Sequence, residues 1–334
     1  MKQLCVIEGD GIGREVIPAA VAILEKVIPD LQIHTAEAGW DCFIRTGTSV
    51  PDETLAVINQ CGAAMFGAVS SPTHVIKGYR SAIITMRQGL NLYANIRPVK
   101  SLPGISFRDD VDLIIVRENT EGLYSGRERL DGDTAIAERV ITRQACIRIA
   151  RAAIQVLQNN GRKKLTIVHK ANILPVTDGL FRDTVRQVVA SALLSGQQIE
   201  IEEMLVDLAA FRMLSEPQAF DVIVTTNLFG DILSDSAAYW GGGMGLAPSI
   251  NLGEHIALAE PVHGSAPDIA GKGLANPIAA ILSAALLCEY YWDAQDVSHK
   301  IRNAVDIFLD QSRSGSNNKL TTKYITNQIL NNLE

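Results

Sequence analysis

Short runs of hydrophobic, β-branched residues alternate with longer segments of mixed hydrophobic and polar character along most of this chain. Such runs are typical of buried strands, and the longer segments have the length of helices. The strands predicted in this way are Leu4–Glu8, Ala63–Gly67, Val111–Arg117, Leu165–His169, Ile199–Val206 and Val222–Thr226. Strands separated by helices indicate an α/β protein with a largely parallel sheet, and 334 residues usually divide into two domains.

Two segments break this alternation. Thr134–Ile141 has the alternating pattern of an exposed strand, and an arm of this kind is suited to pairing with a second subunit. Gln311–Asn318 is polar throughout and predicts a loop before a final amphipathic helix from about Thr321 to Leu333.

Composition and charge exclude several classes of function. The net charge of −7 argues against nucleic-acid binding, because phosphate backbones select basic surfaces. No hydrophobic run reaches the ~18 residues of a membrane helix, and the first residues lead into a strand rather than a signal peptide. The five cysteines are scattered and include no Cys-x-x-Cys pair, which argues against disulfides and zinc. We therefore expect a cytoplasmic protein that binds a small molecule and neither nucleic acid nor a membrane.

The turn Gly9–Gly13 shares some features with a dinucleotide-binding motif. It follows a strand and opens a helix, and Glu37 stands near the end of a second short strand, where a ribose-binding acid is expected. However, Val16 stands where the motif requires its third small residue. We therefore predict a tight turn that needs glycine rather than a standard Rossmann fingerprint.

Asp231 and Asp235 carry the strongest signal for chemistry. They follow the predicted strand Val222–Thr226, and their spacing puts both carboxylates on one face of a helix that starts near Asp231. Hard oxygen ligands in this arrangement suit Mg²⁺ or Mn²⁺. The alternative for an isolated pair of this spacing is an N-cap aspartate followed by a solvated one.

Three arginines and two further residues add to this signal. Arg87, Arg97 and Arg117 fall at predicted strand or helix ends, and three guanidinium forks in one pocket would bind a di- or tricarboxylic acid. Taken singly, each is equally compatible with a solvated strand end. Tyr124 is a candidate proton donor and Lys170 a candidate base, with a core tyrosine and an exposed lysine as the alternatives.

Six segments together resemble one enzyme family. They are Glu8–Gly13, Leu92–Pro98, Val116–Tyr124, His169–Asn172, Asn227–Asp235 and Glu260–Gly273. In this order they resemble the β-decarboxylating dehydrogenases of isocitrate, homoisocitrate and 3-isopropylmalate, from Leu4 to about residue 310. The resemblance implies a two-domain isopropylmalate dehydrogenase-like α/β fold that is not a standard Rossmann fold. Residues 1–98 and 257–334 would form a large, cofactor-binding domain, and residues 99–256 a small domain with the metal site, the dimer interface and a protruding β arm.

The resemblance also implies roles for individual residues. The substrate would contact Arg87, Arg97, Arg117, Asn172 and, as in isocitrate enzymes, a serine at Ser81. Tyr124 and Lys170 would be catalytic, and the metal would be held by Asp207, Asp231 and Asp235. Lys170 and Asp207 would come from the partner subunit, which implies a homodimer with shared active sites, or a tetramer that contains two such dimers. The nicotinamide cofactor would contact Ser71, Glu260, His263, Gly264, Ser265, Ala266, Asp268, Ile269 and Asn276.

Single positions indicate the cofactor and the substrate. A carboxylate at Asp268 accepts hydrogen bonds from a ribose 2′-hydroxyl and repels a 2′-phosphate, so NAD is expected rather than NADP. Val116–Tyr124 resembles the isocitrate and homoisocitrate enzymes, whereas Ile83 and Ile84 replace polar residues found in those enzymes. This apolar pair leaves 3-isopropylmalate open as the substrate. A second alternative is a non-catalytic regulatory subunit of the same fold, because some subunits of hetero-oligomeric members of this family are regulatory. The complete set of catalytic residues favours an enzyme.

Overall fold

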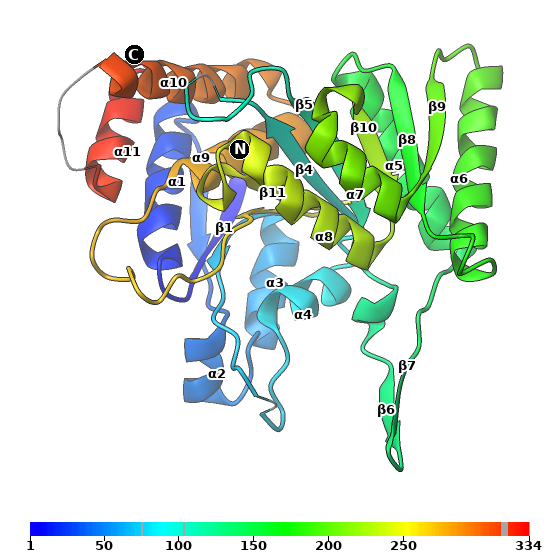
Figure 1. Ribbon diagram of the computed structural model, residues 1–334. Coiled ribbons are helices and arrows are strands. Elements are labelled where there is room, and N and C mark those ends of the chain that lie inside the picture. Colours follow the sequence, from blue (N-terminus) through cyan, green and yellow to red (C-terminus); the bar gives the residue numbers. More distant parts are fainter. Residues whose placement is uncertain (75, 103, 315–319, 334) are drawn as a thin grey trace. The chain divides into compact units, whose positions relative to one another are not determined.

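The computed structural model describes residues 1–74, 76–102, 104–314 and 320–333, and its chain forms two compact units (Figure 1). The first unit comprises Met1–Leu92, Leu102–Asp109 and Gly241–Glu334, and the second comprises Tyr93–Ser101 and Asp110–Trp240. These limits differ from the division at residues 98 and 257 expected from the sequence. The reason is strand pairing: β4 (Ala94–Lys100) pairs along its whole length with β5 (Asp112–Glu118), and β11 (Pro248–Leu252) pairs with β12 (Ala257–Pro261).

The first unit contains five strands in the order β2-β1-β3-β12-β11. All neighbours are parallel except β12 and β11. Besides β11 and β12, its elements are β1 (Gln3–Gly9), α1 (Gly13–Val27), β2 (Gln32–Thr35), α2 (Trp40–Thr46), α3 (Asp52–Cys61), β3 (Ala63–Ala68), α4 (Ala82–Gly89), α9 (Ile278–Tyr290), α10 (Gln295–Ser314) and α11 (Thr322–Asn331). Helix α9 is buried on every side from Ile278 to Cys288, so it is a core helix rather than an amphipathic one.

The second unit repeats this plan, with strands in the order β4-β5-β10-β8-β9 and one antiparallel pair, β4 with β5. Besides β4 and β5, its elements are β6 (Glu128–Asp131), β7 (Thr134–Ala137), α5 (Arg143–Asn159), β8 (Lys164–His169), α6 (Thr177–Leu194), β9 (Glu200–Leu205), α7 (Val206–Ser215), β10 (Val222–Thr225) and α8 (Asn227–Ala237). Leu113 and Ile223 of the sheet pack with Leu233 of α8 in one buried cluster. The central strands are thus buried hydrophobic runs, as parallel strands with helices on both faces require.

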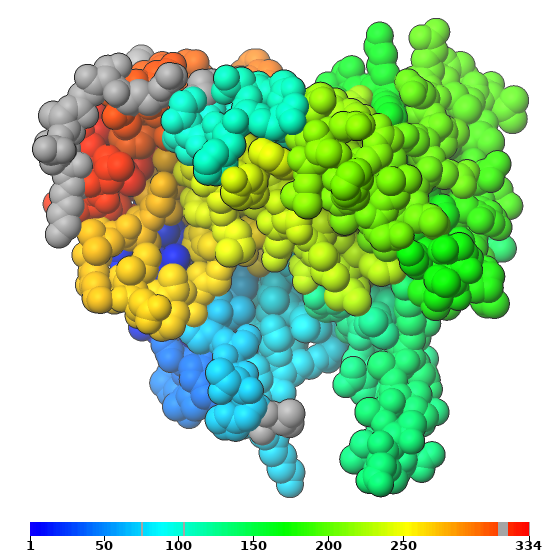
Figure 2. Space-filling view, in the orientation of Figure 1, coloured from blue at the N-terminus to red at the C-terminus, as the bar shows by residue number. Residues whose placement is uncertain are grey.

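All six predicted strands are present, which confirms the α/β prediction. Of the predicted arm, Thr134–Ala137 is a strand, β7, and it pairs with β6 in a hairpin that extends from the second unit (Figure 2). The prediction of a polar loop is wrong at the start of that segment, because α10 continues through Gln311 to Ser314. Residues 315–319 of that stretch lie outside the described residues. In the described parts of the chain, no helix combines the length and the hydrophobicity needed to cross a membrane.

Candidate active site

The two aspartates lie on α8, which follows β10 directly. Asp231 is the fifth residue of this helix, because the helix begins at Asn227 with Thr226 as its N-cap. The helix therefore begins about one turn earlier than expected, because it takes in the residues that were expected to form the turn. The shared face is nevertheless present, since the Arg97 guanidinium lies 2.7 Å from Asp235 Oδ1 and 3.6 Å from Asp231 Oδ1.

Two buried arginines stand beside these carboxylates. Arg97 lies in the middle of β4, not at its end, and Arg117 is the next-to-last residue of β5. Arg117 is fully buried; its Nη1 donates to Asp231 Oδ1, and its Nε and Nη2 donate to Asn227 Oδ1 at 3.1 and 2.7 Å. The positive charge of Arg117 is thus held in place by two side chains of α8.

A glycine permits this close approach of α8 to β5. A Cβ atom on Gly230 would lie 2.6 Å from Arg117 Cγ, closer than Cβ contacts in proteins allow. Neither Gly230 nor Asn227 was identified as a site residue from the sequence. Their position in the Asn227–Asp235 motif was the only sequence signal for them. Their contacts with Arg117 become visible only once α8 is packed against β5.

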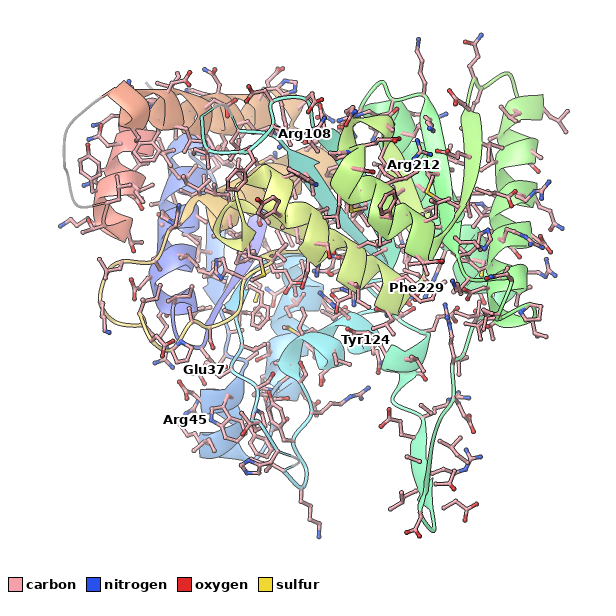
Figure 3. All side chains as sticks on the ribbon, viewed as in Figure 1. Glu37, Arg45, Arg108, Tyr124, Arg212 and Phe229 are labelled. Atoms are coloured by element: carbon pink, nitrogen blue, oxygen red, sulfur yellow. The ribbon has the colours of Figure 1, made fainter. Side chains whose placement is uncertain are left out.

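Tyr124 completes this cluster. It lies in a short 3₁₀ turn, Leu123–Ser125 (Figure 3). Its hydroxyl donates a hydrogen bond to Asp231 Oδ2. The Arg117 guanidinium lies 5.1 Å from its ring centroid. Burial raises the pKa of Tyr124, and the hydrogen bond to Asp231 raises it further. The tyrosine is therefore held in its protonated form, which is the form that can donate a proton.

The carboxylates of this cluster have the chemistry of a divalent metal site. The side chains of Asp231 and Asp235 are 31% and 51% exposed, so a hydrated ion can reach them. Mg²⁺ usually takes one or two protein carboxylates and keeps several waters. In the described residues of this single chain, no group of three His, Cys, Asp or Glu side chains gathers to hold a metal. One chain therefore brings two carboxylates together at this position.

Lys170 and Asp207 form a separate pair. Lys170 follows β8, and its Nζ donates to Asp207 Oδ1 in the first turn of α7. This hydrogen bond lowers the pKa of Asp207. The side chain of Asp207 is 64% exposed, and Asn172 is exposed beside Lys170. Within one chain, Asp207 thus contacts Lys170 and does not join Asp231 and Asp235.

The remaining predicted substrate residues lie in the first unit. Arg87, in the last turn of α4, is buried and donates to Glu260 Oε1 at 2.8 Å. Asn251 donates to the same oxygen at 2.8 Å, so Glu260 is fixed by two side chains. Ser81 is the residue before α4, and its hydroxyl forms no capping hydrogen bond.

Asp10 organises the loops that were predicted to bind the cofactor. It is 2% exposed and accepts three backbone N–H groups, from Trp40 at 2.7 Å, Asp41 at 3.0 Å and Ser70 at 2.9 Å. Ser70 Oγ in turn donates to Ser265 Oγ at 2.8 Å, which ties the loop containing Ser71 to the loop after β12. Sequence reasoning missed Asp10, although a carboxylate between Gly9 and Gly11 was a visible signal for a turn with side-chain hydrogen bonds.

The loop after β12 contains most of the predicted cofactor residues. Gly264 and Asp268 are exposed, Ser265 is buried, and His263, Ala266 and Ile269 are half-buried. Burial lowers the pKa of His263, which is therefore neutral at pH 7. Asn276 Oδ1 accepts the backbone N–H of Ile278 at 3.0 Å, so it also supports the start of α9.

Comparisons with known proteins identify the family. The isocitrate/isopropylmalate dehydrogenase family matches residues 3–329. The chain is 52% identical over 309 residues to the isocitrate/homoisocitrate dehydrogenase of Thermus thermophilus, covering 92% of this chain and 91% of that protein. It is 47% identical over 304 residues to the 3-isopropylmalate dehydrogenase of Methanothermobacter thermautotrophicus, covering 91% and 89%.

A solved structure shows the same fold. The isocitrate dehydrogenase of Methylococcus capsulatus superposes with a TM-score of 0.93 at 40% identity, covering 100% of this chain and 99% of that chain. The fold and the family expected from the sequence are therefore confirmed. The chain belongs to the isocitrate/isopropylmalate dehydrogenase family and is a β-decarboxylating oxidoreductase.

Proposed function

We propose that this enzyme catalyses the NAD-dependent, metal-assisted oxidative decarboxylation of homoisocitrate, isocitrate or both. The observation that supports this proposal best is the cluster of Arg97, Arg117, Tyr124, Asp231 and Asp235 in the second unit. It combines two guanidinium groups, two carboxylates and a protonated phenol. A substrate carboxylate and a divalent cation can therefore bind next to each other, beside a proton donor.

The residues have distinct tasks in this reaction. Arg87, Arg97 and Arg117 bind the substrate carboxylates, and Asn172 and Ser81 add hydrogen bonds. Lys170 takes the proton of the substrate hydroxyl, and Tyr124 protonates the enol left after decarboxylation. Asp231 and Asp235, with Asp207 of a second subunit, hold Mg²⁺ or Mn²⁺. A bound NAD would supply the acceptor for the hydride, and a bound metal ion would supply the positive charge that stabilises the developing enolate during decarboxylation.

The cofactor preference rests on Asp268. Lys272 Nζ donates to the backbone oxygen of Asp268 at 2.6 Å, not to its carboxylate. Lys272 therefore does not compensate the Asp268 carboxylate on this exposed loop, where a carboxylate favours a ribose hydroxyl over a phosphate. We expect NAD to be preferred over NADP by at least ~10-fold in kcat/KM, and Asp268→Lys to narrow or invert this preference.

Steady-state kinetics test the proposed substrate and cofactor. Rates are measured with isocitrate, homoisocitrate and 3-isopropylmalate, each with NAD and NADP, with Mg²⁺ and after chelation. The expected result is metal-dependent turnover of homoisocitrate or isocitrate with NAD. A higher kcat/KM for 3-isopropylmalate would make it the substrate in place of homoisocitrate and isocitrate. The half-buried, hydrophobic Ile83 and Ile84 on α4 would then explain that preference.

We further propose that two subunits share each active site. Lys170 and Asp207 pair with each other, apart from the carboxylates of α8, as expected if they serve a neighbouring subunit. Lys170→Ala and Tyr124→Phe homodimers should each be impaired. A heterodimer of the two contains one site with an intact tyrosine and an intact lysine. After subunit exchange, activity should rise well above that of either variant, and no recovery despite heterodimers verified by mass would refute the sharing.

A further inference from the structure

A buried ion pair in the second unit has no part in the chemistry proposed above. Asp178 lies in the first turn of α6 and is fully buried. Its Oδ1 lies 2.7 Å from Nη2 of Arg139, whose side chain is 15% exposed. The contact has the distance of an ion pair but not the direction of a hydrogen bond. The charge of Asp178 is therefore removed from water and that of Arg139 largely so, and the two charges compensate each other.

The second oxygen of Asp178 holds the backbone of Lys170. Asp178 Oδ2 accepts the Lys170 N–H at 2.6 Å. The Lys170 carbonyl accepts the N–H groups of Ile173 and Leu174 at 3.0 and 2.9 Å, and the Asp178 N–H donates to the Leu174 carbonyl at 3.0 Å. The turn from Lys170 to Asp178 is thus closed at both ends, and the carboxylate fixes where the lysine side chain begins.

Arg139 extends this arrangement to α8. Its Nη2 donates to the hydroxyl of Thr226, the N-cap residue of α8, at 2.8 Å. Its guanidinium lies 4.6 Å from the ring centroid of Phe229 in the first turn of that helix (Figure 3). One arginine therefore contacts both the turn that carries Lys170 and the start of the helix that carries Asp231 and Asp235.

The energetics favour a role in positioning rather than in stability. Burial raises the pKa of Asp178 and lowers that of Arg139, because water no longer solvates either charge. A buried ion pair is often no more stabilising than well-packed hydrophobic residues of similar volume. What hydrophobic residues cannot supply is an acceptor for the Lys170 N–H together with a donor for Thr226.

We propose that Arg139 and Asp178 are positioning residues that hold the backbone of Lys170 against the N-terminus of α8 of its own chain, so that the lysine side chain reaches the neighbouring subunit in one fixed orientation. The inference rests on the proposed catalytic role of Lys170 and adds the device that orients it. Neither residue is proposed to contact the substrate or the cofactor. Both act through the backbone of Lys170 and through the N-terminus of α8.

Asp178→Asn and Arg139→Gln test the pair. Asparagine keeps an oxygen for the Lys170 N–H but removes the charge that attracts Arg139. We expect kcat to fall roughly 10- to 100-fold while KM stays within about threefold, because the lysine is displaced rather than lost. Hydrogen–deuterium exchange of the Lys170 amide should accelerate in both variants. The double variant should be no worse than the more impaired single variant, because both changes break one contact.

Asp183→Asn is the matched control. Asp183 lies on the same helix as Asp178, and its side chain is 52% exposed and paired with Arg182 at 2.7 Å. Its kcat and its Lys170 amide exchange should stay within about twofold of the wild type, since exposed ion pairs contribute little. If Asp178→Asn does not fold, Arg139→Gln alone carries the test, because glutamine keeps a donor for the Thr226 hydroxyl but removes the charge that faces Asp178.

Three results would overturn the proposal. The first is wild-type kcat and wild-type amide exchange in Asp178→Asn. The second is a double variant that shows the sum of the two single losses. The third is a loss of folded protein with an unchanged kcat per folded molecule, since this would make the role purely structural. A fully active Lys170→Ala variant would instead overturn the catalytic role of the lysine, and the exchange rates would still decide whether the pair holds it.

Discussion

The two units build their functional regions by opposite means. In the second unit, charged side chains on regular elements, β4, β5 and α8, form a cluster of ion pairs around Asp231. In the first unit, the side chain of Asp10 collects backbone N–H groups from Trp40, Asp41 and Ser70 and thereby shapes loops. A change in the cluster removes a side chain that is proposed to react with or bind the substrate. A change at Asp10 instead shifts the loops whose backbone N–H groups it holds. The first kind of change should therefore affect kcat, and the second mainly cofactor affinity.

The largest effect is expected for Asp231→Asn. The substitution removes the charge that Arg97, Arg117 and Tyr124 all contact, with little change in volume. We expect kcat to fall by at least ~1,000-fold in assays with saturating Mg²⁺, because the proposed metal ligand and the orientation of Tyr124 are lost together. Ser236→Ala is the control on the same helix, at an exposed position that should stay within about twofold. Undiminished wild-type turnover after thorough chelation would contradict the metal assignment.

Gly230→Ala should show how tightly the cluster is packed. In an open helix this change stabilises by up to ~1 kcal/mol, but here the new Cβ would meet Arg117 Cγ at 2.6 Å. We expect a loss of about 1–3 kcal/mol in the free energy of unfolding, measured in urea, and a fall in kcat of roughly 100-fold as Arg117 moves.

Gly179→Ala is the matched control for Gly230→Ala. Gly179 is a buried helical glycine in α6, and a Cβ there would meet nothing within 4 Å. This variant should be at least as stable as the wild type. Equal effects of the two substitutions would show that the contact with Arg117 is not what requires glycine at position 230.

Asp10→Asn should distinguish the kinetic effect of the loops from that of the cluster. An amide retains one acceptor oxygen, so at least one of the three backbone N–H groups loses its partner. We expect the KM for NAD to rise about 10-fold, equivalent to ~1.4 kcal/mol, while kcat changes much less. A variant with an unchanged KM and a strongly reduced kcat would break the comparison between the two regions.

The smallest expected effect is on how the free energy of unfolding depends on pH, and one histidine of each unit should contribute to it. Burial lowers the pKa of His169 in the second unit and of His263 in the first. A histidine whose pKa in the folded protein lies below its value of about 6.5 in the unfolded chain stabilises the fold above that pH. The free energy of unfolding should therefore fall as the pH drops below about 6.5. Replacing both residues with Asn should flatten this part of the curve, and an unchanged slope would assign it to other groups.

The sequence predicted the strands and the helix face of the two aspartates, because both depend on local periodicity. Arg97 shows where this reasoning ends. It lies in the middle of β4, and its partners Ser234 and Asp235 are more than a hundred positions away in the chain. Hydrophobic patterns do not encode such pairings. The roles of Gly230 and Asp10 were missed for the same reason, since both depend on contacts between elements that are distant in sequence.

Helix α9 bears on how this enzyme can evolve. It is buried on all sides from Ile278 to Cys288 and follows the loop in which Asp268 is exposed. Most mutations in the helix would open cavities or bury polar groups, so selection should remove them. Mutations at Asp268 change few internal contacts and are close to neutral for stability. The chain therefore joins a helix in which most mutations should cost stability to an exposed position, Asp268, where they should cost little, so a change of cofactor preference would be accessible in few mutational steps.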